Sequence, residues 1–145
     1  MTDTKPCLVL DTNVILDLLV FRDPTAEPIR HLLDAKLVDA VRSEASMLEL
    51  VDVIQRPIFK LSQQEQEIIL LVWESLTRLV ENTAIESAPF ICRDLDDQIF
   101  LDMAYSIRPA VLFSKDLRVL ELRVSAKGHG VEITNQYDYL QAPSS

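Results

Sequence analysis

The chain has 145 residues, 48% of them hydrophobic, which predicts one domain over residues 1–145 with a core at about 7–140. No apolar run approaches the roughly 20 residues of a membrane span, and the N-terminus lacks a signal-peptide pattern, so we expect a cytoplasmic protein that does not bind membranes. The net charge of −9, with no basic run, argues against broad binding to long nucleic acids and fits a basic protein partner.

Scarce residue types exclude further classes of site. Gly128 and Gly130 are the only glycines, whereas nucleotide-binding loops need glycines where the backbone approaches phosphate. We therefore expect no nucleotide cofactor. The two cysteines and two histidines do not fall at zinc-ligand spacing, which disfavours a Cys/His metal site.

Strands and helices alternate along the chain, which predicts an α/β fold with a mostly parallel sheet. The expected strands are residues 7–10, 38–41, 79–80, 111–113 and 131–133. The expected helices are residues 14–21, 24–35, 44–55, 63–76, 97–107 and 117–122, with a loop at 81–93 and a frayed tail at 143–145. Ser43 and Ser62 suit helix N-caps, and Glu65 gives Ser62 the spacing of a capping box.

The helix at 63–76 is apolar beyond one stripe. Its main apolar face holds Ile68, Ile69, Val72, Trp73 and Leu76. Leu70 and Leu71 fall outside that face. A helix of this kind is either deeply buried or contacts a partner, and both readings stay open.

Four acidic residues fall at element ends or helix starts that a parallel sheet would bring to one edge. They are Asp11, Glu49, Asp97 and Asp116. Asp11 directly follows the apolar run 7–10, which is where open α/β sheets place their chemistry. Carboxylates without histidine or cysteine suit Mg²⁺ or Mn²⁺, ions that can activate water and stabilise the charge of a phosphoryl group.

The acids at the strand ends also have a structural reading. Asp11 and Asp116 could be ordinary helix caps. Glu49 lies opposite the apolar stripe of its helix, which predicts a solvent-facing side chain, and it could instead form a local cap with Ser46.

The acids in and just before the helix at 97–107 differ in the direction that each side chain is expected to face. Asp97 lies at the border of the apolar stripe and can face a cleft, whereas Asp102 points away from it. Asp94 and Asp96 are better read as cap and helix-dipole partners, and either could assist a metal.

Four segments, in order, resemble the PIN domain family over about residues 8–140. They are Leu8-Val9-Leu10-Asp11-Thr12-Asn13-Val14, the helix from Ser43 to Val53, Cys92-Arg93-Asp94-Leu95-Asp96-Asp97 with Phe100 and Ala104, and Val111-Leu112-Phe113-Ser114-Lys115-Asp116. The third segment resembles the VapC-like subgroup, which are toxins of type II toxin–antitoxin systems. The resemblance implies a Rossmann-like three-layer α/β/α fold with a central parallel sheet of order about 3-2-1-4-5.

The resemblance also implies an activity, a metal-dependent endoribonuclease that hydrolyses RNA phosphodiester bonds with Mg²⁺ or Mn²⁺. A homodimer and a cognate antitoxin protein are implied as partners. The implied catalytic and metal-binding residues are Asp11, Glu49, Asp97 and Asp116, with Asn13, Ser114, Asp94 and Asp96 in support. Lys115 stands where the family often has glycine, and it would alter the mouth of the site or place a cation near substrate phosphate.

Other functions stay open. A catalytically weak or inactive PIN-fold binding or regulatory module is favoured by the acidic charge and the broad apolar helix, and disfavoured by the intact acids. A 5′-nuclease-like enzyme acting on DNA is near in fold, but we expect such an enzyme to be larger. A haloacid-dehalogenase-like hydrolase needs aspartate where Asn13 stands.

Overall fold

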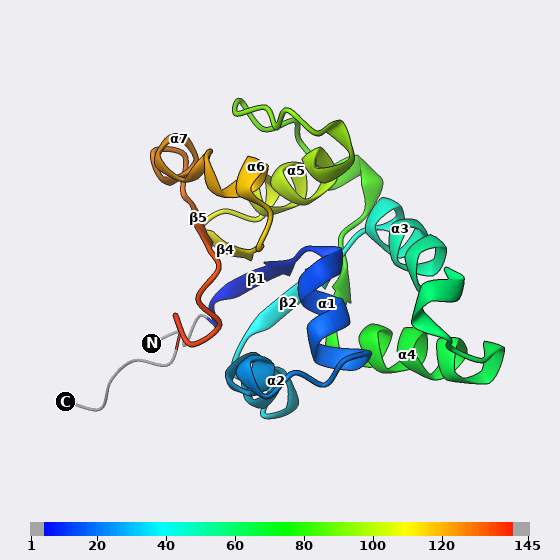
Figure 1. Ribbon diagram of the computed structural model, residues 1–145. Coiled ribbons are helices and arrows are strands. Elements are labelled where there is room, and N and C mark those ends of the chain that lie inside the picture. The colour runs from blue at the N-terminus through cyan, green and yellow to red at the C-terminus, as the bar shows by residue number, and fades with distance from the viewer. Residues whose placement is uncertain (1–4, 141–145) are drawn as a thin grey trace.

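A five-stranded, all-parallel sheet forms the centre of the computed structural model, which describes residues 5–140 (Figure 1). The strands are β1 (Cys7–Leu10), β2 (Asp39–Arg42), β3 (Arg78–Leu79), β4 (Ala110–Phe113) and β5 (Val131–Thr134). Their order is β3-β2-β1-β4-β5, which confirms the expected order 3-2-1-4-5. Because Leu10 pairs with Phe113, β1 and β4 end side by side, at the point where the strand order reverses.

Helices cover both faces of the sheet and complete the expected three layers (Figure 1). On one side lie α1 (Thr12–Leu19), α2 (Glu27–Asp34), α3 (Glu44–Ile54) and α4 (Gln63–Leu76). On the other lie α5 (Gln98–Ser106), α6 (Leu117–Leu120) and α7 (Arg123–Lys127). The central strands β1 and β4 are therefore buried on both faces, which explains why these two strands are continuous apolar runs.

Alternate residues of each strand enter different cores. Leu8 and Leu10 of β1 pack among the helices α1 to α4, whereas Val9 packs among α5, α6 and α7. β4 alternates in the same way, with Phe113 in the first core and Leu112 in the second. This period of two fixes which way each strand faces, because a slip of one residue would exchange the two cores.

Side-chain caps fix where α3 and α4 begin. The Ser62 hydroxyl accepts from the Glu65 N–H (3.0 Å) and the Glu65 carboxylate accepts from the Ser62 N–H (2.9 Å), which confirms the expected capping box. The expected Ser43 cap is also confirmed, but its partner is Ser46. The alternative of a Ser46 and Glu49 cap is therefore wrong, and Glu49 is left free for another contact.

Some boundaries differ from those expected. The helix expected at 97–107 begins at Gln98, after a 3₁₀ turn at Leu95–Asp97. The helix α7 was not expected, because only Ala126 of its five residues is buried and no apolar stripe marks it. In α4, Ile69 and Trp73 are buried as expected, but Ile68 is 53% exposed. The tail at 143–145 lies outside the described residues.

Candidate active site

The carboxyl ends of β1 and β4 place two of the predicted acids on neighbouring strands. The Asp11 N–H donates to the Phe113 carbonyl (3.2 Å), so the β1–α1 turn is joined to the end of β4. Ser114 follows Phe113 and is fully buried, and its hydroxyl accepts from the Asp116 N–H (3.1 Å). This edge of the sheet therefore fixes the backbone on both sides of the site.

Asp11 caps a helix and also lies near the other predicted acids. Its Oδ1 accepts from the Val14 N–H (3.1 Å) at the N-cap of α1, and the side chain also takes a hydrogen bond from Ser114. Burial, with smaller contributions from the nearby charges of Asp116 and Glu49, raises the pKa of Asp11 to about 6, although the two hydrogen bonds act in the opposite direction. The structural and functional readings of Asp11 thus do not exclude each other.

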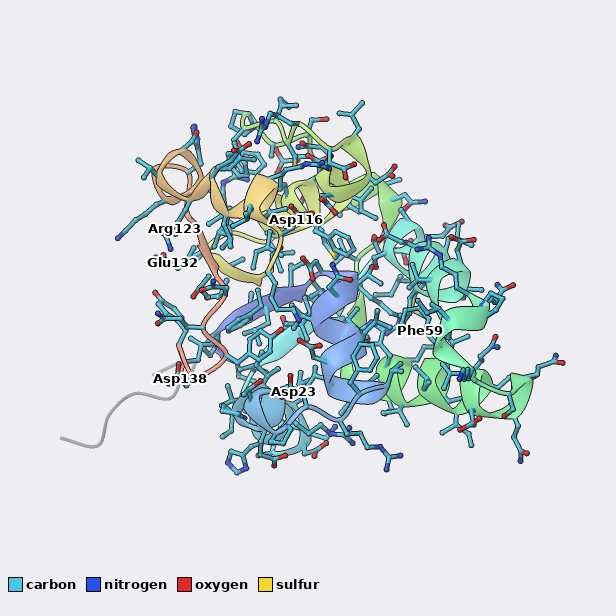
Figure 2. All side chains as sticks on the ribbon, in the orientation of Figure 1. Asp23, Phe59, Asp116, Arg123, Glu132 and Asp138 are labelled. Carbon is cyan, nitrogen blue, oxygen red and sulfur yellow. The ribbon has the colours of Figure 1, made fainter. Side chains whose placement is uncertain are left out.

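Three carboxylates form the tightest acidic group at this edge. Asp94, Asp97 and Asp116, called the acid cluster below, each offer an oxygen that lies within 4.8 Å of the others. Asp116 caps α6 through the Arg118 N–H (2.8 Å), and the Arg118 guanidinium binds Asp94 (3.0 Å). Figure 2 shows Asp116 at the start of α6, above the end of the sheet.

Asp97 has the least compensated carboxylate of the acid cluster. Its Oδ2 is buried and has no hydrogen-bond partner among the described residues. Burial, the close approach of the Asp116 carboxylate and the charges of Asp116, Asp94 and Asp11 together raise the pKa of Asp97 to about 7. A buried, unpartnered carboxylate oxygen is costly, and a bound cation would remove that cost.

Glu49 approaches the site from α3. The Thr12 hydroxyl donates to its Oε1 (2.9 Å), and the side chain is half-buried, so the expectation that it faces solvent is wrong. The expectation assumed that α3 buries only one stripe of side chains, but α3 contacts both α1 and α5. Burial raises the pKa of Glu49, and the charges of Asp96 and Asp94 act in the same direction.

The four predicted acids thus fall into two groups, one inside the acid cluster and one close to it. Asp97 and Asp116 meet in the acid cluster with Asp94, which sequence reasoning had placed in a supporting role. Asp11 and Glu49 lie outside that group but are close enough for their charges to act on each other. The exposed Asn13 and Asp96 lie at the rim.

The sequence analysis did not predict two residues that contact acids of the candidate site. Thr12 holds Glu49, and its position directly after Asp11 was the only available signal. Arg118 binds Asp94 across 24 residues of sequence, a contact that no local pattern indicates. The Lys115 ammonium forms an ion pair with Asp17 (2.6 Å), and its expected effect on the mouth of the site stays a prediction.

The donor set fits a hard divalent cation. The acid cluster supplies only carboxylate oxygens, the ligands that Mg²⁺ and Mn²⁺ prefer, and one guanidinium offsets only part of its charge. Asp11 and Glu49 add two further carboxylates nearby. The arrangement could hold such an ion next to a phosphate group.

Comparisons with known proteins agree with this description. A family model for the PIN domain matches residues 7–118, a stretch that includes all four predicted acids. A crystal structure of VapBC2 from Rickettsia felis, bound to a DNA fragment from their promoter, is similar in fold, with a TM-score of 0.60 at 13% identity. The match covers 88% of this chain and 97% of that one. The curated proteins gave no significant match.

Within residues 5–140, no helix is both long and apolar enough to cross a membrane.

Proposed function

We propose that this chain, which belongs to the PIN domain family, is a nuclease toxin that hydrolyses RNA phosphodiester bonds with bound Mg²⁺ or Mn²⁺. The observation that carries the proposal is the buried oxygen of Asp97, which has no hydrogen-bond partner among the described residues and lies beside two other carboxylates. Carboxylates arranged in this way destabilise the metal-free fold, and a divalent cation would reverse that effect.

Each acid has a distinct part in the proposed site. Asp97 and Asp116 would hold the ion directly, and Asp11, fixed by Val14 and Ser114, would contribute from β1. Glu49, oriented by Thr12, would bind through water or hold a second ion. A bound ion would polarise the phosphate and activate water for attack.

The decisive test is cleavage of a mixed RNA pool in the presence of Mn²⁺, parent against Asp97→Asn, with the product ends identified. The parent should cut RNA, and the variant should lose at least about 100-fold in rate, because it removes a ligand but keeps the size of the side chain. Asp39→Asn is the matched control, since Asp39 lies at the opposite end of the sheet, where β2 begins. Equal rates for parent and Asp97→Asn would remove Asp97 from the mechanism.

The same assay separates the other readings. Cleavage of a DNA pool but not of RNA would favour a 5′-nuclease-like enzyme. Binding of Mn²⁺ without cleavage of either pool would favour a binding or regulatory module. Mn²⁺-induced thermal stabilisation of the parent, lost in Asp11→Asn, would support the metal site without depending on the choice of substrate.

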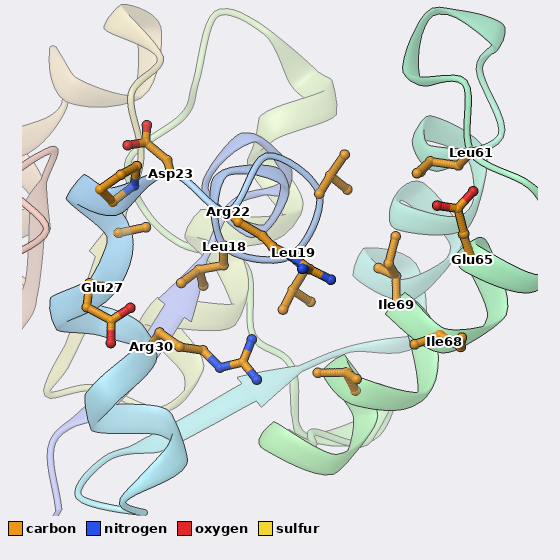
Figure 3. Close-up of a pocket in the computed structure, with 14 residues that line it drawn as sticks. Leu18, Leu19, Arg22, Asp23, Glu27, Arg30, Leu61, Glu65, Ile68 and Ile69 are labelled. Carbon is orange, nitrogen blue, oxygen red and sulfur yellow. The ribbon is translucent and has the colours of Figure 1, made fainter.

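We place the proposed antitoxin partner in a groove between α4 and the α1–α2 pair (Figure 3). The groove has a volume of about 750 Å³ and an apolar lining that includes Leu18, Leu19, Leu61, Ile68 and Ile69. Asp23, Glu27 and Glu65 also line it, against Arg22 and Arg30. An apolar segment with basic flanks would complement this surface and the net charge of −9.

Two substitutions on one helix test this placement. Ile68 lines the groove and is 53% exposed, whereas Leu71 is 65% exposed and is not part of the lining. Ile68→Glu should abolish co-purification with the co-expressed product of the adjacent gene, and Leu71→Glu should not. Light scattering of the same variants tests the proposed homodimer, and dissociation by Leu71→Glu alone would assign that face of α4 to a second copy.

A further inference from the structure

A second buried carboxylate lies on α1, away from the acid cluster. Asp17 is 5% exposed, and its Oδ2 accepts a hydrogen bond from the Tyr137 hydroxyl (2.6 Å) and forms an ion pair with the Lys115 ammonium (2.6 Å). Asp17, Lys115 and Tyr137 are called the Asp17 cluster below. Tyr137 lies beyond the residues matched by the family model, so this part of the cluster is contributed by the chain's own C-terminal segment.

The charges in this cluster are balanced. A buried carboxylate is stable only when it is paired and hydrogen-bonded, and Asp17 has both a cation and a hydroxyl donor. The Lys115 side chain is 47% exposed, so the ammonium is not needed to fill the core. Its short contact with Asp17 therefore fixes a loop residue against a helix.

That loop carries Asp116 of the acid cluster. Lys115 lies between Ser114, which bonds the Asp116 N–H, and Asp116 itself. The preceding residue, Phe113, packs edge-on against Tyr137 with ring centroids 6.4 Å apart. The turn between β4 and α6 is thus held to α1 at Lys115 and to the Asp17 cluster again through Phe113.

We propose that Asp17 and Lys115 are positioning residues whose ion pair fixes the turn at 114–116 and so holds Asp116 in place beside Asp97. The consequence for metal binding rests on the proposed function, but the consequence for the turn does not. In this proposal Lys115 acts as a structural cation, because its ammonium is paired with Asp17.

The test uses a double variant that leaves the net charge unchanged, Asp17→Asn with Lys115→Met. Its matched control is Asp39→Asn with Arg78→Met, another ion pair between residues distant in sequence (2.9 Å). Two quantities are measured on the full chain. They are the Mn²⁺ dissociation constant by calorimetry and, without metal, the hydrogen exchange rates of the Asp116 and Arg118 amides by NMR.

In the Asp17 double variant we expect Mn²⁺ affinity to fall about tenfold, as for other residues that orient metal ligands. Exchange of the two amides should become about tenfold faster, since their bonds to Ser114 and Asp116 depend on the turn. The control should change neither quantity. The single variant Lys115→Arg should keep both quantities near the parent's values, because arginine can still pair with Asp17.

Lys115→Met alone distinguishes the effect of the position of Asp116 from the effect of the lysine charge. The same variant tests the inference if the double variant does not fold. Removing a positive charge near carboxylates would by itself tighten Mn²⁺ binding, whereas a displaced Asp116 weakens it. Tighter binding, or unchanged affinity and exchange in the double variant, would overturn the inference and leave the proposed function intact. A parent that does not bind Mn²⁺ would overturn the proposed function, and the exchange rates would still decide whether the pair fixes the turn.

Discussion

Two carboxylates at opposite ends of α1 show how equal burial leads to different chemistry. Asp11 is 3% exposed and Asp17 is 5% exposed, and both contact the segment that follows β4. Asp17 faces a lysine and a tyrosine, so its charge is compensated within the fold. Asp11 faces Asp116 and Glu49, and burial raises its pKa to about 6. Burial alone therefore does not distinguish the two carboxylates, whereas their partners do.

The most direct test of this difference between Asp11 and Asp17 is to replace each of them with asparagine. Without metal at pH 7, Asp11→Asn should raise the free energy of unfolding by about 1–2 kcal/mol, because asparagine still caps Val14 but removes a buried charge. Asp17→Asn should lower it by about 1–2 kcal/mol, because the ion pair with Lys115 is lost. Urea denaturation of both variants in EDTA measures the two signs, and equal signs would contradict the comparison.

The pH dependence of stability sharpens the same contrast. The folded pKa of Asp11 is raised from 3.8 to about 6, so the folded state holds this proton more tightly than the unfolded state. The resulting stability is fully present below pH 3.8 and is lost as the pH rises to about 6, with a total on the order of 2–3 kcal/mol. Asp97, with a pKa raised to about 7, extends the loss in the same direction.

The parent should therefore lose more stability between pH 4 and 7 than Asp11→Asn does, when both are measured without metal by urea denaturation. The difference between the two curves isolates Asp11, because the other titrating groups are common to both proteins. Parallel curves would show that Asp11 titrates alike in the folded and unfolded states. Added Mn²⁺ should reduce the slope of the parent, since a bound cation favours the ionised carboxylates.

Much of the fold and of the candidate site could be predicted from the sequence, because the signals for strands, helix caps and strand-end acids are local. The apolar runs at 7–10 and 111–113 predicted the two central strands, and the acids beyond them, Asp11 directly after the first and Asp116 three residues after the second, follow neighbouring strand ends. The side chain of Glu49 was wrongly expected to face solvent, because a single buried stripe does not describe α3, which packs against the three helices α1, α4 and α5. The Tyr137 contact with Asp17 joins residues 120 positions apart, and no spacing rule reaches that far.

The smallest expected effect tests the hydroxyl that Tyr137 gives to Asp17. Tyr137→Phe keeps the ring against Phe113 but removes a buried hydrogen bond of 2.6 Å, so the free energy of unfolding should fall by about 0.5–1 kcal/mol. Tyr139→Phe is the matched control, because Tyr139 is 45% exposed, and it should stay within about 0.5 kcal/mol of the parent. Because Lys115 still pairs with Asp17, Tyr137→Phe should cost less than Asp17→Asn with Lys115→Met. A cost equal to that of the double variant would mean that the tyrosine, and not the lysine, supplies most of the compensation for Asp17.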